Sequence, residues 1–182
     1  MKYNLDWLLN ATATKQKLKY LYFWGHRPAP NNEITASCFS QWWDGHPFES
    51  EGIIYLTAEH YMMASKAQLF GDYKIYEAIL TAETPGKAKA LGRQVKNFDF
   101  DVWVSNRCEI VTKGNYLKFS QHEELKRFLL NTNNRVLVEA SPVDRVWGIG
   151  LVKDDPNASA PALWQGENLL GFCLMEARDL LI

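Results

Sequence analysis

The chain has 182 residues, of which 47% are hydrophobic and 23% are charged, as is typical of a globular protein with a full apolar core. Its 20 basic and 21 acidic residues give a net charge of −1, which argues against a strongly basic nucleic-acid-binding protein but allows a local basic patch. Cys38, Cys108 and Cys173 form no CxxC pair and are odd in number. They predict buried thiols in a reducing compartment, with no disulfide framework and no zinc site.

The start of the chain lacks the apolar region of a secretory signal, and no apolar run reaches the length of a membrane span. These features predict a cytoplasmic protein. The length predicts one domain. The aromatic content of 13% favours an aromatic-lined pocket.

Extended segments come first in chain order. Three runs rich in aromatic and β-branched residues predict extended structure, and they cover residues 20–24, 36–43 and 46–56. The last of them predicts a hairpin with Glu51 and Gly52 at its turn. A polar, proline-rich loop at 25–33 separates the first two.

Helical signals follow. Helices are expected over 57–71, 72–82, 84–92, 99–119 and 120–132, the fourth of them starting from Asp99 or Asp101. Thr84, Pro85 and Gly92 suit the cap, the first turn and the end of one of these helices. Ser120 and Glu123 have the spacing of a capping box.

The last third of the chain predicts a strand at 135–140, a long loop at 141–166 and a helix at 167–182. The buried face of that helix is expected to hold Leu169, Leu170, Cys173, Leu174, Ala177 and Leu181. This order of elements predicts an α+β fold, predominantly helical, with a small β-sheet surrounded by helices. The sequence has no GxGxxG after a strand and no GxxxxGK(S/T), so Rossmann and P-loop nucleotide binding are unsupported.

One predicted helix carries an acid and an amine on the same stripe. Glu59 and Lys66 are seven residues apart, which returns them to nearly one helical face, with Met62 and Met63 between them and His60 nearby. An ordinary surface acid and base is one interpretation. The other is a cleft wall, where partial burial lowers the pKa of the lysine and makes its neutral amine a nucleophile.

A glycine-rich loop at 139–150 is the second candidate. Gly148 and Gly150, beside Trp147, suit a backbone that passes close to a ligand, and Asp144 lies in the same loop. The alternative is a tight turn with a packed tryptophan.

Two further stretches suit phosphate or base binding. In WQGENLLG (164–171), Asn168 is a candidate cap, and the helix start is expected to offer unpaired N–H groups to a phosphate. The alternative there is a plain N-cap. Around LGRQVKNF (91–98), Arg93, Lys96 and Arg107 are candidate phosphate ligands and Trp103 is a candidate base-stacking residue. The alternative is ordinary surface charge.

Taken together and in this order, the motifs make the sequence closely resemble the NADAR family, also called YbiA-like proteins. The resemblance makes 1–19 an N-terminal extension with no assigned role and 20–182 the NADAR (YbiA-like) domain. The matching runs are FWGH (23–26), FSQWW (39–43), TAEHYMMASKAQLFGD (57–72), LGRQVKNF (91–98), KFSQHEELKRFLLNT (118–132), LVEASPVDRVWGIG (137–150) and GENLLGFCLMEARDLL (166–181).

The resemblance implies N-glycoside hydrolysis, with no metal and no cofactor. Two substrate classes are associated with the family: ribosylamino-pyrimidine phosphates of riboflavin biosynthesis, and guanine that carries ADP-ribose on its exocyclic amine, in nucleic acid or free nucleotide. In both, ribose C1 is bonded to an exocyclic amine and can open to an imine that a neutral lysine attacks. We expect ADP-ribosyl-guanine to be the substrate. A module that binds ADP-ribose without turnover is the alternative from another class.

Catalysis is expected to involve Glu59, Lys66 and Asp144, either through a Schiff base on the lysine or by direct departure through an oxocarbenium-like state. Substrate-binding residues are expected at Phe23, Gly25, Ser40, Arg93, Trp103, Trp147, Gly148, Gly150 and Asn168. The run FSQWW departs from the FSNF of many relatives, so Gln41 is expected to change the contacts to the base.

Overall fold

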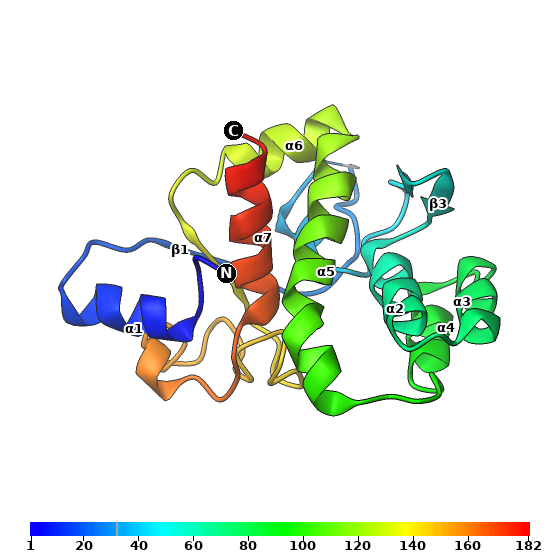
Figure 1. Ribbon diagram of the computed structural model, residues 1–182. Helices are drawn as coiled ribbons and strands as arrows, with labels where there is room; N and C mark the ends of the chain where they lie inside the picture. Colours follow the sequence, from blue (N-terminus) through cyan, green and yellow to red (C-terminus); the bar gives the residue numbers. More distant parts are fainter. Residues whose placement is uncertain (32) are drawn as a thin grey trace. The chain divides into compact units, whose positions relative to one another are not determined.

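A computed structural model describes residues 1–31 and 33–182, so position 32 of the expected loop at 25–33 lies outside the described residues. The described residues form seven α-helices, two short 3-10 helices and two two-stranded sheets (Figure 1). The predicted α+β class, with little sheet among many helices, is therefore confirmed. The chain forms two compact units, one of Met1–Ser40 and Glu123–Ile182 and one of Gln41–His122.

The first unit is built on a parallel strand pair. Strand β1 (Tyr20–Phe23) runs beside β4 (Val136–Glu139), and both confirm expected strands. Helix α7 (Leu169–Leu180) packs on β4 and is buried on nearly all sides, which is more than the single buried face expected of it. A Cβ on Gly171 would lie only 2.1 Å from the Leu137 carbonyl oxygen, so glycine lets the helix lie directly on the strand.

The expected extended segment at 36–43 is wrong. Residues Ala36–Phe39 form the 3-10 helix η1, because the N–H groups of Cys38 and Ser40 bond to carbonyls three residues back and not to a strand. Phe39 is fully buried, and its ring meets that of Phe23 edge-to-face at 5.4 Å. Burial of aromatic side chains, and not pairing in a sheet, therefore explains this part of the sequence.

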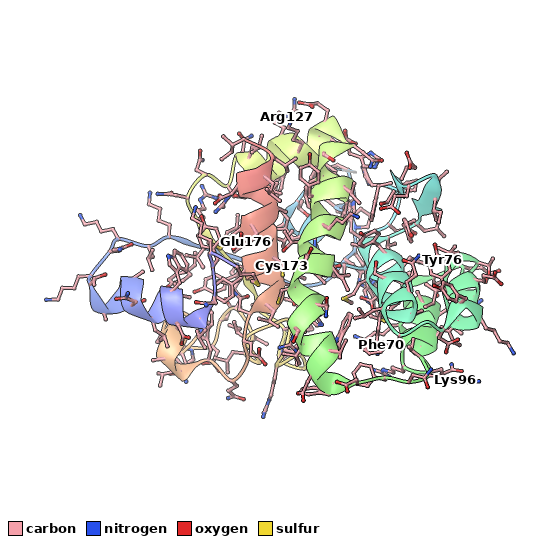
Figure 2. The ribbon with its side chains drawn as sticks, viewed as in Figure 1. Phe70, Tyr76, Lys96, Arg127, Cys173 and Glu176 are labelled. Carbon is pink, nitrogen blue, oxygen red and sulfur yellow. The ribbon has the colours of Figure 1, made fainter. Side chains whose placement is uncertain are left out.

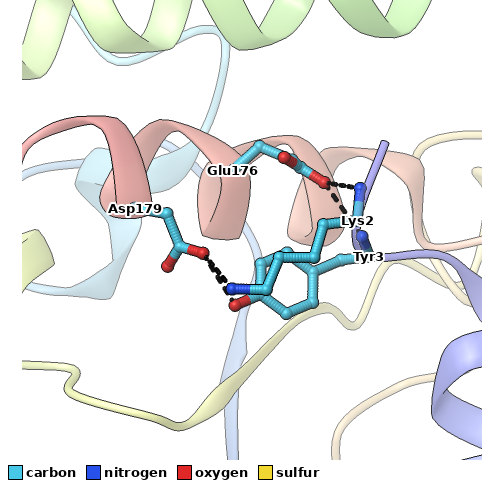
Figure 3. Close-up of polar contacts among 4 residues, drawn as sticks. All are labelled: Lys2, Tyr3, Glu176 and Asp179. Carbon is cyan, nitrogen blue, oxygen red and sulfur yellow. Dashed lines mark hydrogen bonds and ion pairs between the residues drawn. The ribbon is translucent and has the colours of Figure 1, made fainter.

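The first unit contains three more elements: α1 (Leu5–Ala13), α6 (Glu123–Leu130) and the 3-10 helix η2 (Pro161–Leu163). Helix α1 lies in the segment to which the sequence assigned no role. Lys2 and Tyr3, just before it, bond to Glu176 and Asp179 of α7, as Figure 3 shows. These contacts fix the start of the chain to the C-terminal helix.

The second unit holds the hairpin and four helices. Strands β2 (Phe48–Ser50) and β3 (Ile53–Tyr55) are antiparallel, and the expected turn residues between them both have positive φ. Helices α2 (Ala58–Leu69), α3 (Tyr73–Leu80), α4 (Pro85–Gly92) and α5 (Phe100–Ser120) follow, and α2 packs against the other three. The first three of these helices lie together in Figure 1.

Side-chain caps fix the starts of these helices. Thr57, Asp72, Thr84 and Asp99 each accept a hydrogen bond from the backbone N–H three residues ahead. The expected capping box at Ser120 is wrong, because Ser120 is the last residue of α5 and its hydroxyl donates to the Leu117 carbonyl. Among the helices of the described residues, none has both the length and the apolar composition needed to cross a bilayer.

Candidate active site

Lys66 lies near the end of α2, in the second unit, and is half-buried. Its Nζ donates a hydrogen bond of 2.9 Å to the Gly92 carbonyl oxygen. The same nitrogen lies 4.3 Å from the centre of the Phe98 ring and 5.6 Å from that of Trp103. Burial lowers the pKa of Lys66 below its usual value. The neutral, nucleophilic amine is therefore more populated here than in an exposed lysine.

Gly92 brings the carbonyl oxygen within reach of Lys66. It is the last residue of α4, as the sequence predicts for a terminating glycine. A Cβ at this position would lie 2.1 Å from the Met63 sulfur of α2, so any larger residue would push the Met63 side chain out of the space between the two helices. The sequence analysis missed this second function, because the helix-ending role already accounts for a glycine at this position.

Asp72 holds the loop that carries Phe98. Its Oδ1 accepts from the Ile75 N–H at 3.2 Å, and its Oδ2 accepts from the Lys96 N–H at 2.9 Å. These two donors lower the pKa of the Asp72 carboxyl. Phe98 also packs edge-to-face on Phe70, with ring centres 5.2 Å apart. Phe70 and Lys96 mark this part of the second unit in Figure 2.

The Phe98 ring lies against the Lys66 amine on one side and is 43% exposed, so it stands between the amine and the solvent. We expect Phe98→Ala to raise the pKa of Lys66, because water then reaches the amine. Phe98→Leu keeps the apolar bulk but removes the attraction of the ring for an ammonium ion, roughly 0.5–2 kcal/mol, and is expected to lower that pKa further. The measurement is the pH dependence of Lys66 acylation, followed by peptide mass analysis. Equal pKa values in the wild type and both variants would contradict this role.

Glu59 lies in the first turn of α2 and is only 2% exposed. Its backbone N–H donates to the Gln41 carbonyl at 2.9 Å. Helix α2 runs without interruption from Glu59 to Lys66, so the predicted spacing of seven residues on one helix is confirmed. Met62 and Met63, between them, are buried. The acid is thus a buried group and not part of a solvated surface.

His60 has a structural role. Its Nε2 lies 2.9 Å from the Ala82 carbonyl oxygen, and its Nδ1 lies 2.8 Å from the Thr57 hydroxyl. A carbonyl only accepts, so Nε2 carries the proton and Nδ1 accepts from the hydroxyl. Burial lowers the pKa of His60 and favours the neutral ring. The imidazole therefore ties the start of α2 to the end of α3.

Two other predicted binding residues lie in the second unit. Trp103 is in the first turn of α5, half-buried, and the structure brings it to Lys66. Arg93 follows Gly92 and caps α4 from an exposed position. A phosphate-binding role for Arg93 stays a prediction.

Asp144 lies in the first unit and organises the predicted glycine-rich loop. Its Oδ1 accepts from the backbone N–H groups of Val146 and Trp147, at 2.9 and 2.7 Å. A Cβ on Gly148 would lie 2.9 Å from the Glu139 carbonyl oxygen, and Gly150 has a φ of +70°. Close packing of the loop backbone therefore accounts for both glycines, and their contact with a ligand stays a prediction.

The expectation of unpaired N–H groups at the start of α7 is wrong. The N–H groups of Leu169 and Leu170 donate to the carbonyls of Val146 and Trp147, and that of Asn168 donates to Gly148. The Asn168 side chain does not cap the helix. The carbonyl groups of the neighbouring loop accept these hydrogen bonds, so the N–H groups at the start of the helix are not available to a phosphate.

Asn168 is fully buried and joins α7 to strand β4. Its Oδ1 accepts from the Glu139 N–H and its Nδ2 donates to the Leu137 carbonyl, both at 2.9 Å. Its φ of +55° is left-handed, a conformation that asparagine tolerates. Its side chain therefore holds the start of α7 on β4, and its contact with a substrate stays a prediction.

A cavity of about 520 Å³ lies within the first unit, where β1 ends. It is lined in part by Phe23, Trp24 and Ser37, and Trp24 is 58% exposed. Gly25 follows with a φ of +81°, and Ser40 caps η1. Of the predicted ribose-side residues, Phe23 is the one that lines this cavity.

Metal ions in proteins are commonly held by clusters of acidic, histidine and cysteine side chains. Within residues 1–31 and 33–182, no three His, Cys, Asp or Glu side chains form a group able to hold one. The groups around the Lys66 amine are a backbone carbonyl and two aromatic rings, and the Glu59 carboxylate lies on the same helix, seven residues away.

Comparison with known proteins shows a consistent similarity. Residues 22–182 match the family model described as the NADAR domain. An N-glycosidase of Acanthamoeba polyphaga mimivirus is 42% identical over 165 residues, covering 88% of this chain and 95% of the relative. N-glycosidase YbiA of Escherichia coli is 33% identical over 143 residues, covering 79% and 78%. The NMR structure of E. coli YbiA aligns with a TM-score of 0.69 at 29% identity, over 90% of this chain and 84% of that one. The predicted resemblance is confirmed.

Proposed function

Because this chain belongs to the NADAR domain family and is an N-glycosidase, a hydrolase of N-glycosyl compounds, we propose that its substrate is guanine carrying ADP-ribose on the exocyclic amine. The guanine is part of a nucleotide or a nucleic acid, and the enzyme acts in the cytoplasm. Reaction at an exocyclic amine suits a lysine nucleophile, because such a glycoside can open to an imine at ribose C1.

The environment of Lys66 carries this proposal. The residue is half-buried, and its Nζ donates to the Gly92 carbonyl and lies against the Phe98 and Trp103 rings. Desolvation favours the neutral amine, which a binding module does not need. The arrangement therefore supports catalysis over simple recognition of ADP-ribose.

The proposed reaction has two stages. The Lys66 amine adds to C1 of the ring-opened imine, and a proton moves to the nitrogen of the base. The base then leaves as a free amine, and C1 stays bound to the lysine as a Schiff base. Water adds to that carbon, and the C–N bond to lysine breaks, which releases ADP-ribose and restores the amine. Glu59 supplies and accepts the protons in both stages.

The first unit by itself holds a cavity of a size that is common for ligand sites. Its volume of about 520 Å³ is within the range of roughly 300–1,000 Å³ that is common for ligand sites. The exposed Trp24 ring offers a face on which a base can stack.

A rate comparison tests the assignment. The enzyme is incubated with ADP-ribosylated guanine nucleotide and, in parallel, with a ribosylamino-pyrimidine phosphate. We expect a larger kcat/KM for the first, with free ADP-ribose and the guanine nucleotide as products. Preference for the second would assign the chain to riboflavin intermediates, and binding without turnover would make it a reader of ADP-ribose.

Two substitutions at Asp144 separate the effect of its charge from the effect of its hydrogen bonds to the loop. Asp144→Asn keeps an oxygen for the Val146 and Trp147 N–H groups, so we expect an unchanged melting temperature and turnover reduced roughly 10- to 100-fold. Asp144→Ala loses both bonds and is expected to melt lower as well. Kinetics and melting are measured on both variants. Wild-type turnover in the Asn variant would leave Asp144 with a purely structural role.

A further inference from the structure

The side-chain amide nitrogen of Gln41 is buried and makes no hydrogen bond within the described residues. The residue is 7% exposed, and its Nε2 is buried. No part of the described chain accepts a hydrogen bond from that nitrogen. Buried polar groups in proteins are nearly always paired, and an unpaired donor destabilises the folded state. A group of this kind needs an explanation outside the fold.

The position of Gln41 relates it to the proposed catalytic acid. Its backbone carbonyl accepts from the Glu59 N–H at 2.9 Å, which satisfies one of the donors of the first turn of α2. The backbone of Gln41 is therefore fixed at the start of the helix that carries Glu59 and Lys66. Its side chain is a rigidly attached amide with donor and acceptor capacity left over.

We propose that the Gln41 amide is a specificity-determining group that hydrogen-bonds the leaving base on its lactam edge, the ring carbonyl and adjacent ring N–H. Guanine carries this edge next to its exocyclic amine, and its ring carbonyl O6 is an acceptor. A carboxamide pairs with such an edge through both its ends, with the NH₂ donating to the carbonyl and the oxygen accepting from the N–H. This inference rests on the proposed function, because it names the base of that substrate.

The structure yields a test in which stability and activity move in opposite directions. Gln41→Met has a similar length and removes the buried donor, so we expect the melting temperature to rise by about 2–4 °C. The kcat/KM for ADP-ribosylated guanine is expected to fall roughly 10- to 100-fold. For ADP-ribosylated 2-aminopurine, which has the exocyclic amine but no ring carbonyl, the wild type and the variant are expected to be equal.

Gln68→Met is the matched control, since Gln68 is an exposed glutamine on the same helix α2. It is expected to leave both rates unchanged. A lower melting temperature for Gln41→Met, or an equal loss on both substrates, would overturn the proposal by giving Gln41 a structural role.

A second measurement does not depend on turnover or on the variant's folding. The side-chain amide resonance of Gln41 in the wild type is expected to shift when guanosine monophosphate is added and to stay unchanged with 2-aminopurine riboside monophosphate. No shift with the guanine nucleotide contradicts the proposal. Failure of the proposed function would show differently, as a wild-type enzyme that hydrolyses neither ADP-ribosylated base.

Discussion

Borohydride added during turnover is expected to leave the sugar covalently attached to Lys66. The Schiff base between the lysine and C1 is reduced to a stable amine, and mass analysis places the adduct on the peptide containing MMASKAQLF. Lys66→Arg is expected to lose turnover by on the order of 10³-fold or more, because a guanidinium stays protonated and forms no imine. Lys66→Met is expected to be equally inactive.

Folding and catalysis can be separated at this position. The folded state lowers the pKa of Lys66, so the unfolded chain binds its proton more tightly and stability rises with pH between the two pKa values. At neutral pH the half-buried amine therefore opposes folding, and Lys66→Met is expected to melt no lower than the wild type. Activity is expected to rise with pH as the amine loses its proton. The apparent pKa of this rise is expected to be lower than the pKa of an exposed lysine.

Lys89→Arg is the control for Lys66→Arg. Lys89 is also half-buried and lies near a tryptophan, with its Nζ 5.7 Å from the Trp42 ring, but it has no part in the proposed reaction. Its variant should remain active. An active Lys66→Arg enzyme that yields no adduct would exclude the Schiff base and favour departure through an oxocarbenium-like state, in which a positive charge is enough.

Glu59→Gln is expected to lower kcat by about 10²- to 10⁴-fold, the usual effect of losing a general acid or base. Glutamine keeps the shape of the side chain and forms helices about as well as glutamate, so the first turn of α2 and the hydrogen bond from the backbone of residue 59 to Gln41 should persist. The measurement is single-turnover kinetics beside thermal melting. The two must be compared, because Glu59 is only 2% exposed and its replacement is made in the interior.

Glu77→Gln provides the comparison, since Glu77 is an exposed glutamate of the neighbouring helix α3. It should leave turnover and melting at wild-type values. Near-wild-type turnover in Glu59→Gln would remove Glu59 from the mechanism, and equal losses in both variants would point to a general effect of charge.

Local chemistry in the sequence accounts for most of the secondary structure. The cap at Thr84 and the turn at Glu51 and Gly52 depend on a few neighbouring residues, and both lie where the sequence places them. Asp99, one of the two expected starts of α5, is the one that caps it. These features can be predicted from the sequence because helix caps and tight turns depend on side chains that contact backbone groups within four residues.

The errors have a common cause. Residues 36–39 have the composition of a strand, but they pair with no strand in the described part of the chain, and they turn locally so that Phe39 packs on Phe23 of β1. The start of α7 looks like an anion site, yet the loop at 145–149 supplies carbonyls to its N–H groups. Helix α1 was not expected either, and its preceding residues are fixed by distant Glu176 and Asp179. In each case the deciding partner is remote in sequence.

The sequence by itself determined that Glu59 and Lys66 share one face of one helix, since a spacing of seven residues fixes that in any α-helix. Only the tertiary structure decided what surrounds the amine. The Gly92 carbonyl is 26 residues away along the chain, and the Phe98 ring arrives on a loop held by Asp72. The pKa of a lysine depends on the water and dipoles around its nitrogen, and packing between helices, not spacing along one of them, sets those surroundings.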